Sequence, residues 1–454
     1  MERINKLSKL LKDTSINALI GWILVLLLFL TGIVNLMNGR FTWSILSFSV
    51  ILIITSPALL LRKASIMPSW YLIILAIMPL VGSTTAYHLF FTSIPVYLSV
   101  ATIALLLVAE MSWFTSVRMH YKFAILLVAA ITLSMSGLWH LLHWLMDINF
   151  GTTFLLDGRS QEAINAAVMH EFMYATVTGI VAGAIFGFYL RSPGSAGNVK
   201  LPPQGLLKTP EYPVSRPPAP LRRLLGISGS KQKFATRVMQ AGLFILLIVA
   251  LYIRDLPTAL NAIAGIAITF VPSFITRKYN IPLDPGLTLW ITLAIFMDAL
   301  GTFAFYENVA RWDNITHALS ASVIAAAGYA LIRAIDIYTD EIYIPSKMLF
   351  LFILLFVLAT GVIWEIMEFL TDELAAELGY KAVLVQHGIN DTMIDMSFNL
   401  LGAILAATWG AAYLSDISYR LARRFEEISA NNNSIKESEE HLQANVFADN
   451  LNNR

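Results

Sequence analysis

The chain has 454 residues, of which 57% are hydrophobic and 13% are charged, and its formal net charge is +1 at pH 7. This composition excludes a soluble protein, and the charge gives no indication of nucleic-acid binding because the basic residues are spread over short loops. The absence of cysteine excludes disulfides, thiolate metal sites and cysteine catalysis. Apolar runs long enough to cross a bilayer recur from end to end, which predicts a polytopic membrane protein.

Twelve apolar runs predict transmembrane helices, six in each half of the chain. The expected spans are 17–37, 42–61, 69–87, 93–114, 122–146 and 164–190, then 235–253, 257–275, 287–305, 314–334, 347–370 and 391–415. The first run is too long for a signal-peptide core and no cleavage site follows it, so we expect a retained helix. Continuous apolar runs favour helices over alternating barrel strands. The predicted fold is an all-α, polytopic membrane helical bundle with about 12 transmembrane helices.

Basic residues set the expected orientation of these spans. They precede the first span and follow the second, fourth, eighth, tenth and twelfth spans, whereas the alternate loops are poor in Lys and Arg. The positive-inside rule assigns the basic side to the cytoplasm. We therefore expect an inner-membrane or plasma-membrane protein with both termini in the cytoplasm.

A nine-residue pattern occurs twice and predicts an internal duplication. Residues 139–147 read W-H-L-L-H-W-L-M-D, and residues 364–372 read W-E-I-M-E-F-L-T-D. A lysine stands 17 residues before each copy, and S-P-A-L-L-L-R-K (56–63) aligns with V-P-S-F-I-T-R-K (271–278) without gaps. Such self-similarity indicates two homologous halves. Because each half has an even number of spans, the halves are expected to be parallel six-helix repeats.

This duplication predicts four segments. The first repeat is expected over 1–191 and the second over 234–416, joined by a cytoplasmic linker at 192–233 that holds eight prolines and an excess of basic residues. Such a linker is typical of a tether that is partly extended. A polar cytoplasmic tail is expected over 417–454.

The second half carries a set of polar residues within its predicted spans. The set comprises Asp313 and His317 in the tenth span, Glu365, Glu368 and Asp372 in the eleventh, and Asp391, Asp395 and Asn399 in the twelfth. Spacings of three and four place each group on one helical face, and the expected topology places all three groups at the extracytoplasmic end. Charges within spans are costly, so a shared functional site is the default interpretation. Six carboxylates and a histidine suit a divalent ion such as manganese, iron or magnesium.

The first half has matching positions with different chemistry. They are His88, His140, His143, Asp147 and His170, with Glu171 as an additional carboxylate. Neutral imidazoles with one or two carboxylates suit zinc, copper, iron or nickel. The alternative for both halves is structural: interfacial histidines in the first, and in the second an interhelical hydrogen-bond network. Mutual repulsion of so many carboxylates favours function over structure in the second half.

Three motifs of the second half carry a family resemblance. They are W-D-N-I-T-H-A-L-S-A (312–321), G-V-I-W-E-I-M-E-F (361–369) and D-T-M-I-D-M-S-F-N-L-L-G-A (391–403). On these motifs, residues 235–415 resemble the YjdF-like family of uncharacterised membrane proteins and, more distantly, the VanZ-like membrane proteins. The resemblance implies a small helical bundle with an acidic and histidine set, but no settled activity. The first half departs from the pattern at nearly every acid.

Three kinds of function remain open from the sequence. The first is a metal-dependent enzyme at the extracytoplasmic membrane surface, in which the metal activates water for a lipid-type substrate and Glu365 or Glu368 is the base. The second is a transporter or binding protein for a cation or cationic solute. The third is a non-catalytic scaffold whose polar set only fixes the bundle. The lipid bilayer is the expected environment in every case, and lipid head groups or a metal ion are the expected partners.

Overall fold

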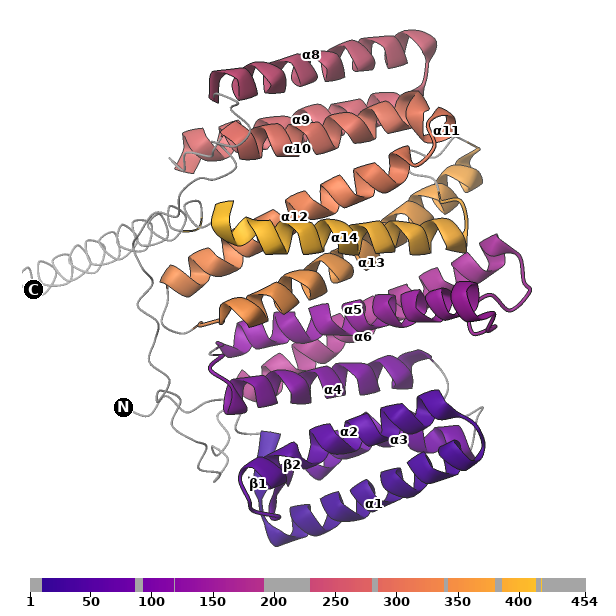
Figure 1. Ribbon diagram of the computed structural model, residues 1–454, viewed down its shortest axis with the longest axis vertical. Coiled ribbons are helices and arrows are strands. Elements are labelled where there is room, and N and C mark those ends of the chain that lie inside the picture. Colours follow the sequence, from indigo (N-terminus) through magenta and orange to yellow (C-terminus); the bar gives the residue numbers. More distant parts are fainter. Residues whose placement is uncertain are drawn as a thin grey trace, which may run out of the picture. The chain divides into compact units, whose positions relative to one another are not determined.

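The computed structural model describes residues 10–85, 93–117, 119–191, 229–279, 285–338, 342–379, 386–413 and 418. Each of the twelve predicted spans coincides with a helix (Figure 1). The helices are α1 Ser15–Met37, α2 Phe41–Leu60, α3 Trp70–Thr85, α4 Ser93–Phe114, α5 Tyr121–Phe150, α6 Gln161–Arg191, α8 Gly229–Ile253, α9 Leu256–Tyr279, α10 Pro285–Leu300, α11 Tyr306–Asn308, α12 Trp312–Tyr338, α13 Ser346–Leu378 and α14 Ile389–Tyr413, with a π-helix Gly301–Phe305 between α10 and α11. The prediction of an all-α membrane bundle is confirmed.

Length and hydropathy mark most of these helices as membrane-spanning. Among the described residues, ten helices are long and apolar enough to cross a bilayer, and α3 contributes a shorter apolar segment, Trp70–Gly82. Many large apolar side chains are exposed on these helices, including Ile16, Phe188 and Ile248. Outward-facing apolar side chains of this kind are expected where the surrounding solvent is lipid.

A short antiparallel β-ribbon lies beside α1, and it was not predicted from the sequence. Strand β1 (Leu11–Asp13) pairs with β2 (Ile66–Pro68), so that Leu11 lies opposite Pro68. The Asn17 side chain fixes this ribbon, because its amide donates to the Pro68 carbonyl at 3.0 Å and its oxygen accepts from the Trp70 backbone N–H at 2.9 Å. The ribbon thereby ties the start of α1 to the start of α3.

The chain divides into two compact units, which we describe separately. Unit 1 comprises Met1–Pro213, Arg311–Ala321 and Glu341–Ile404, and unit 2 comprises Val214–Ala310, Ser322–Asp340 and Leu405–Arg454. Unit 1 therefore combines α1–α6 with the start of α12, with α13 and with most of α14. The boundaries of the two predicted repeats stay a prediction, and most of the linker 192–233 and of the tail 417–454 lies outside the described residues.

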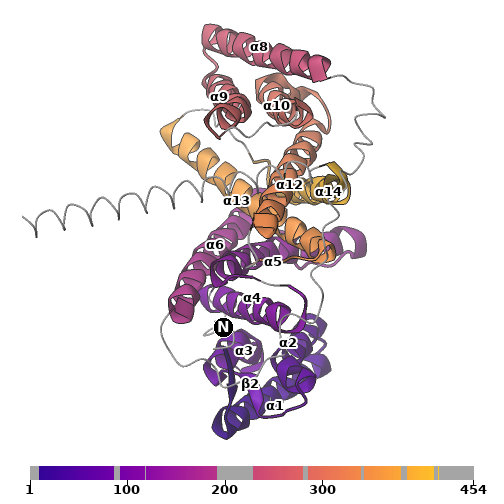
Figure 2. The same ribbon diagram turned by 90° about the vertical axis from the view of Figure 1, so that its left-hand side faces the viewer.

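The core of unit 1 lies among α5, α6, α13 and α14 (Figures 1 and 2). Buried apolar side chains of all four helices form one cluster, with Phe172 and Met396 fully enclosed. Helix α5 approaches α13 closely at Gly137, where a Cβ atom would lie 2.8 Å from the Val362 side chain. Within a bilayer the lipid is as apolar as these side chains, so close van der Waals packing is what stabilises the association of the four helices. It holds the helices that carry most of the predicted polar residues.

Helices α12 and α14 also approach closely within unit 1. A Cβ atom on Gly402 would clash with the backbone carbonyl oxygen of Ala318. Because a backbone atom cannot move aside as a flexible side chain can, glycine is required at this position. The contact lies one helical turn beyond Asn399 on α14 and next to His317 on α12, so it fixes the spacing of two helices that bear polar residues.

In unit 2, helices α8, α9 and α10 pack against one another around Leu243, Leu246 and Ala299. Asp298 of α10 is satisfied within this unit: Asn261 donates to it at 3.0 Å and the Tyr306 hydroxyl donates to it at 2.6 Å. These bonds account for a carboxyl placed in a predicted span.

Candidate functional site

Three helix segments of unit 1 carry the polar residues predicted for the second half. Asp313 and His317 lie in the first two turns of α12, and Asp391 and Asp395 lie in the first two turns of α14. Helix α13 contributes Glu365 well inside its length. The spacing of four residues places each pair on one face of its helix, as predicted.

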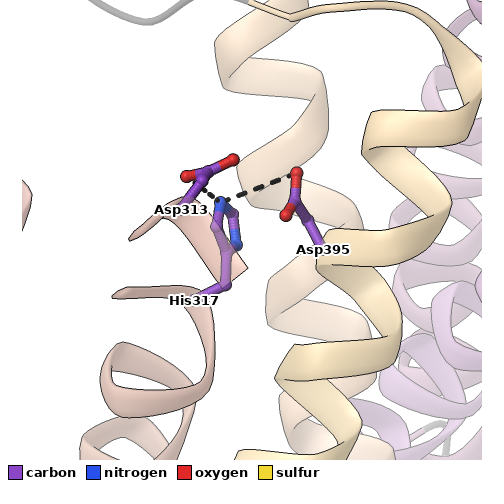
Figure 3. A group of neighbouring side chains, drawn as sticks. All are labelled: Asp313, His317 and Asp395. Carbon is purple, nitrogen blue, oxygen red and sulfur yellow. Dashed lines mark ion pairs between the residues drawn. The ribbon is translucent and has the colours of Figure 1, made fainter. Parts of the chain in front are cut away.

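Asp313, His317 and Asp395 form one cluster, which we call the DHD cluster. Figure 3 shows His317 between the two carboxyls, with Asp313 on the same helix and Asp395 on another. The His317 Nε2 atom lies 3.5 Å from Asp313 Oδ1 and 3.8 Å from Asp395 Oδ2. One potential ligand atom from each residue lies within 4.8 Å of the others. Among the described residues, these three side chains are the group close enough together to hold a metal ion.

The second oxygen of Asp395 has no hydrogen-bond partner. Asp395 is 3% exposed, and its Oδ1 atom is buried without a donor within reach. The neighbouring carboxyls of Asp313, Glu365, Asp391 and Glu368 act on it electrostatically and repel its charge. A buried carboxyl that lacks a donor and faces like charges is costly unless a proton or a cation compensates it. The DHD cluster therefore favours a bound proton or cation beside Asp395.

Glu365 belongs to a buried hydrogen-bond chain that joins four elements. It is 0% exposed, and the Gln386 amide donates at 3.0 Å both to its Oε2 atom and to its backbone carbonyl. The Gln386 oxygen accepts from the Asn165 amide of α6 at 2.7 Å, and Asn165 accepts from the Thr392 hydroxyl at 3.1 Å. The Glu365 Oε1 atom is buried without a partner. This arrangement holds Glu365 in place rather than leaving it open to solvent.

The other predicted residues of the second half have their own partners. Glu368 accepts from the indole N–H of Trp364 at 2.8 Å, and Asp391 accepts from the backbone N–H of His387 at 3.2 Å. The backbone of Gln386 donates to the Asp372 carboxyl. Asn399 is buried near Gly361, where a Cβ atom would lie 3.3 Å from its amide nitrogen. None of these four residues joins the DHD cluster as a ligand-spaced member in the described part of the chain.

In the first half, His140 forms a polar network with residues of α4 and α6. The His140 Nε2 atom lies 3.0 Å from Glu171 Oε2, and its Nδ1 atom lies 2.9 Å from the Ser136 carbonyl oxygen. The Tyr97 hydroxyl donates to the same Glu171 oxygen at 3.1 Å. His140 and Tyr97 are buried. One imidazole, one phenol and one carboxylate thus converge between three helices.

Three other predicted residues of the described first half have contacts of their own. The ring of His143 stacks on Phe154, with the ring centres 5.1 Å apart. The Nδ1 atom of His170 lies 2.6 Å from the carbonyl oxygen of Ala166, one turn earlier in its own helix. Asp147 accepts four hydrogen bonds from the loop that follows α5, from the Thr152 hydroxyl and the backbone N–H groups of residues 154, 155 and 156.

Among the described residues of the first half, the histidines do not belong to a group with metal-ligand spacing. His88 lies outside the described residues, so the predicted first-half site that includes it stays a prediction.

Three residues that contribute to this region were not predicted: Gln386, Asn165 and Tyr97. Gln386 and Asn165 carry the hydrogen bonds of Glu365, and Tyr97 anchors Glu171. Asn165 is a polar residue near the start of an apolar helix, a signal that was available in the sequence. Gln386 lies in a loop, and no periodicity points to it.

A known family model matches the part of the chain that contains the DHD cluster. Residues 235–416 match the family model described as "Predicted membrane protein (DUF2238)", and this range includes all three residues of the cluster. The second half of the chain matches a membrane-protein family. We refer to residues 235–416 as the DUF2238 region; neither its description nor its boundaries state an activity.

Two further matches cover smaller parts of the chain. Residues 5–67, which include β1, α1 and α2, match a domain of unknown function (DUF8268). A Thermotoga maritima protein described as uncharacterized is 33% identical over 121 residues, which are 26% of this chain and 58% of that protein. The chain therefore spans little more than half the length of this relative. No solved structure matches.

Proposed function

We propose that the DUF2238 region binds a divalent transition-metal ion at the DHD cluster. The observation that carries the proposal is the spacing of the three ligand atoms. Metal–ligand bonds of about 2.0–2.2 Å place neighbouring ligands of a tetrahedral ion roughly 3.3–3.6 Å apart. The His317 nitrogen lies 3.5 Å and 3.8 Å from the two carboxylate oxygens, so a small shift of side chains admits an ion.

The ligand chemistry favours a particular class of ion. One imidazole and two carboxylates suit zinc, iron or manganese better than calcium, which takes six to eight oxygen ligands. Three protein ligands leave coordination positions for water or substrate, which is the arrangement of catalytic metal sites. The unpartnered, buried oxygen of Asp395 supports the demand for a cation.

The proposal extends to metal-dependent chemistry on a lipid-type substrate at the extracytoplasmic side. A bound metal lowers the pKa of its water and supplies a nucleophile at neutral pH. Of the two predicted bases, Glu368 suits the role better, because it is partly exposed and near Asp395, whereas Glu365 is 0% exposed and held by Gln386. Lipid head groups would reach such a site from the membrane surface.

Two other functions each have one supporting observation. A cation carrier requires charged groups at more than one depth, and α12 carries a second polar group, the ion pair of Arg333 with Asp336, toward its other end. A scaffold requires a polar network that ties helices together, and the hydrogen-bond chain of Gln386 with Glu365 and Asn165 has this form. Neither observation accounts for the buried Asp395 Oδ1 atom, which has no hydrogen-bond partner.

Metal analysis of the purified full-length chain tests the proposal. Titration with Zn²⁺ and with Mn²⁺, followed by elemental analysis, is expected to give one tightly bound ion per chain. Asp395→Asn and His317→Ala are expected to weaken binding by more than the roughly 10–100-fold seen when only a second-shell partner is lost. His170→Ala is the matched control and is expected to bind like the wild type. Equal binding by Asp395→Asn and the wild type, or no stoichiometric binding by the wild type, would overturn the proposal.

A further inference from the structure

Helix α4 carries a carboxyl that none of the sites above uses. Glu110 lies one turn before the end of α4 at Phe114, and its Oε1 atom is buried without a hydrogen-bond partner. The polar neighbour of this carboxyl is the Ser56 hydroxyl of α2, whose oxygen is also buried and which acts on the carboxyl as a hydrogen-bond donor. Two polar side chains from different helices therefore lie together, and Glu110 Oε1 has no hydrogen-bond partner.

Another polar group without a partner lies on the same face of α4. Trp113 is 3% exposed, and its indole N–H is buried without an acceptor. Residues three apart project from one side of a helix, so Trp113 and Glu110 project on the same side of α4. Buried polar groups almost always have partners, and an exception calls for a water, an ion or a functional role.

No charge compensates Glu110 among the described residues. Helix α4 packs against α2, α3, α5 and α6, and the interactions that act on the Glu110 carboxyl include no charged side chain from any of them. An ionised carboxylate in such surroundings is disfavoured within a membrane protein. The neutral acid avoids this cost, and its O–H supplies a donor that the carboxylate lacks.

A metal ion does not fit this place. The described neighbours offer one carboxyl and one hydroxyl, and the indole nitrogen is a donor only. Even small cations such as Mg²⁺ or Zn²⁺ require four to six ligands. A single proton requires one carboxyl oxygen and is the ligand that the available groups accommodate.

We propose that Glu110, with Ser56 and Trp113, forms a membrane-embedded proton-binding site in unit 1, separate from the DHD cluster. The position one turn from the end of α4 places the carboxyl about 6 Å from the end of the helix axis, close enough for proton exchange with water at that face. By the expected topology this is the cytoplasmic face, opposite the predicted outer site. The Tyr97 end of α4 carries the Glu171 network, so one helix connects polar groups at two depths.

Covalent labelling of the full-length chain in lipid nanodiscs tests this site. Dicyclohexylcarbodiimide enters apolar regions and reacts with protonated carboxyls. The acid O–H adds across one C=N bond, the oxygen bonding to carbon and the proton passing to nitrogen, and rearrangement to the N-acylurea leaves the whole reagent attached. We expect mass spectrometry to find this adduct on Glu110. Above the midpoint of titration the labelling rate is expected to fall about tenfold per pH unit, because the protonated fraction falls by that factor.

Two controls make the outcome decisive. A water-soluble carbodiimide with an added amine is expected to modify the exposed carboxyls of Asp157 and Glu162 but not Glu110. Glu110→Gln, which resembles the neutral acid, is expected to lose the adduct and to keep the wild-type melting temperature. Recovery of the Glu110 peptide without adduct at every pH, modification of Glu110 by the soluble reagent, or marked destabilisation by Glu110→Gln would each overturn the proposal.

Discussion

Replacing Gln386 with leucine tests whether the buried hydrogen-bond chain holds the site in place. The change removes the amide that donates to Glu365 Oε2 and to its carbonyl, both at 3.0 Å, and the oxygen that accepts from Asn165 at 2.7 Å. Because Glu365 and Asn165 are 0% and 5% exposed, water does not replace the lost partners. Leaving a buried polar group without a partner costs about 1–3 kcal/mol, so two groups imply a loss of about 2–6 kcal/mol in the free energy of unfolding.

Equilibrium unfolding in mixed micelles, followed by tryptophan fluorescence, measures this loss. The matched control is Gln240→Leu in unit 2, which removes one long bond of 3.3 Å to the Thr269 carbonyl and is expected to cost less than about 1 kcal/mol. In a Glu365→Leu background, Gln386→Leu is expected to cost less, with a coupling energy of about 0.5–3 kcal/mol. A Gln386→Leu variant within about 0.5 kcal/mol of the wild type, a change typical of inert surface positions, would refute the reasoning.

Three further predictions follow from contacts elsewhere. Gly402→Ala is expected to push α14 away from the Ala318 carbonyl. Zn²⁺ binding at the DHD cluster is then expected to weaken at least about tenfold, as it does when the surroundings of metal ligands are disturbed. Unchanged affinity in a metal titration would contradict this. Asp147→Ala is expected to lower the free energy of unfolding by about 2–4 kcal/mol, since four hydrogen bonds to one carboxylate are lost. Asp147→Asn should lose less stability, because the asparagine side-chain oxygen still accepts hydrogen bonds. Equal melting temperatures for the two variants would argue against the loop contacts. The hydrogen bond from Lys63 holds the pKa of Asp13 below its usual value, so the stability it contributes is present above about pH 4 and is lost as the pH falls through the lowered pKa. Asp13→Asn should therefore be less stable than the wild type at pH 7 and equal to it in strong acid, and a stability difference independent of pH would count against this pairing.

The membrane fold was well predicted from the sequence because the thickness of the bilayer sets the length of an apolar run that forms a spanning helix. All twelve predicted spans coincide with helices, since continuous apolar segments near 20 residues leave few alternatives to a helix. The β-ribbon was not predicted because three residues per strand carry no periodicity, and its pairing of Leu11 with Pro68 joins segments far apart in the chain.

The candidate site was predictable in part. The spacing of four residues correctly placed Asp313 beside His317 on one face of α12. The cluster with Asp395 forms because α12 and α14 lie side by side there. Spacing does not specify which neighbour a side chain reaches. Glu368 turns to Trp364, and Asp147 turns to its own loop. Tertiary packing decides these choices, and a pattern within one helix does not encode it.

The shared core of α5, α6, α13 and α14 has a consequence for how this protein can be dissected. The similarity to the DUF2238 family begins at residue 235, yet the buried Met393 and Val362 of this region pack in a cluster with Val168 and Phe172 of α6. A fragment containing the DUF2238 region alone would expose this surface and strand the Gln386 oxygen that accepts from Asn165. Such a fragment needs a second surface of the same kind, from the first half supplied as a separate chain or from another copy of itself. The boundary of sequence similarity is therefore not the boundary of a part that can fold alone. The two halves expressed together are the smallest pieces expected to assemble.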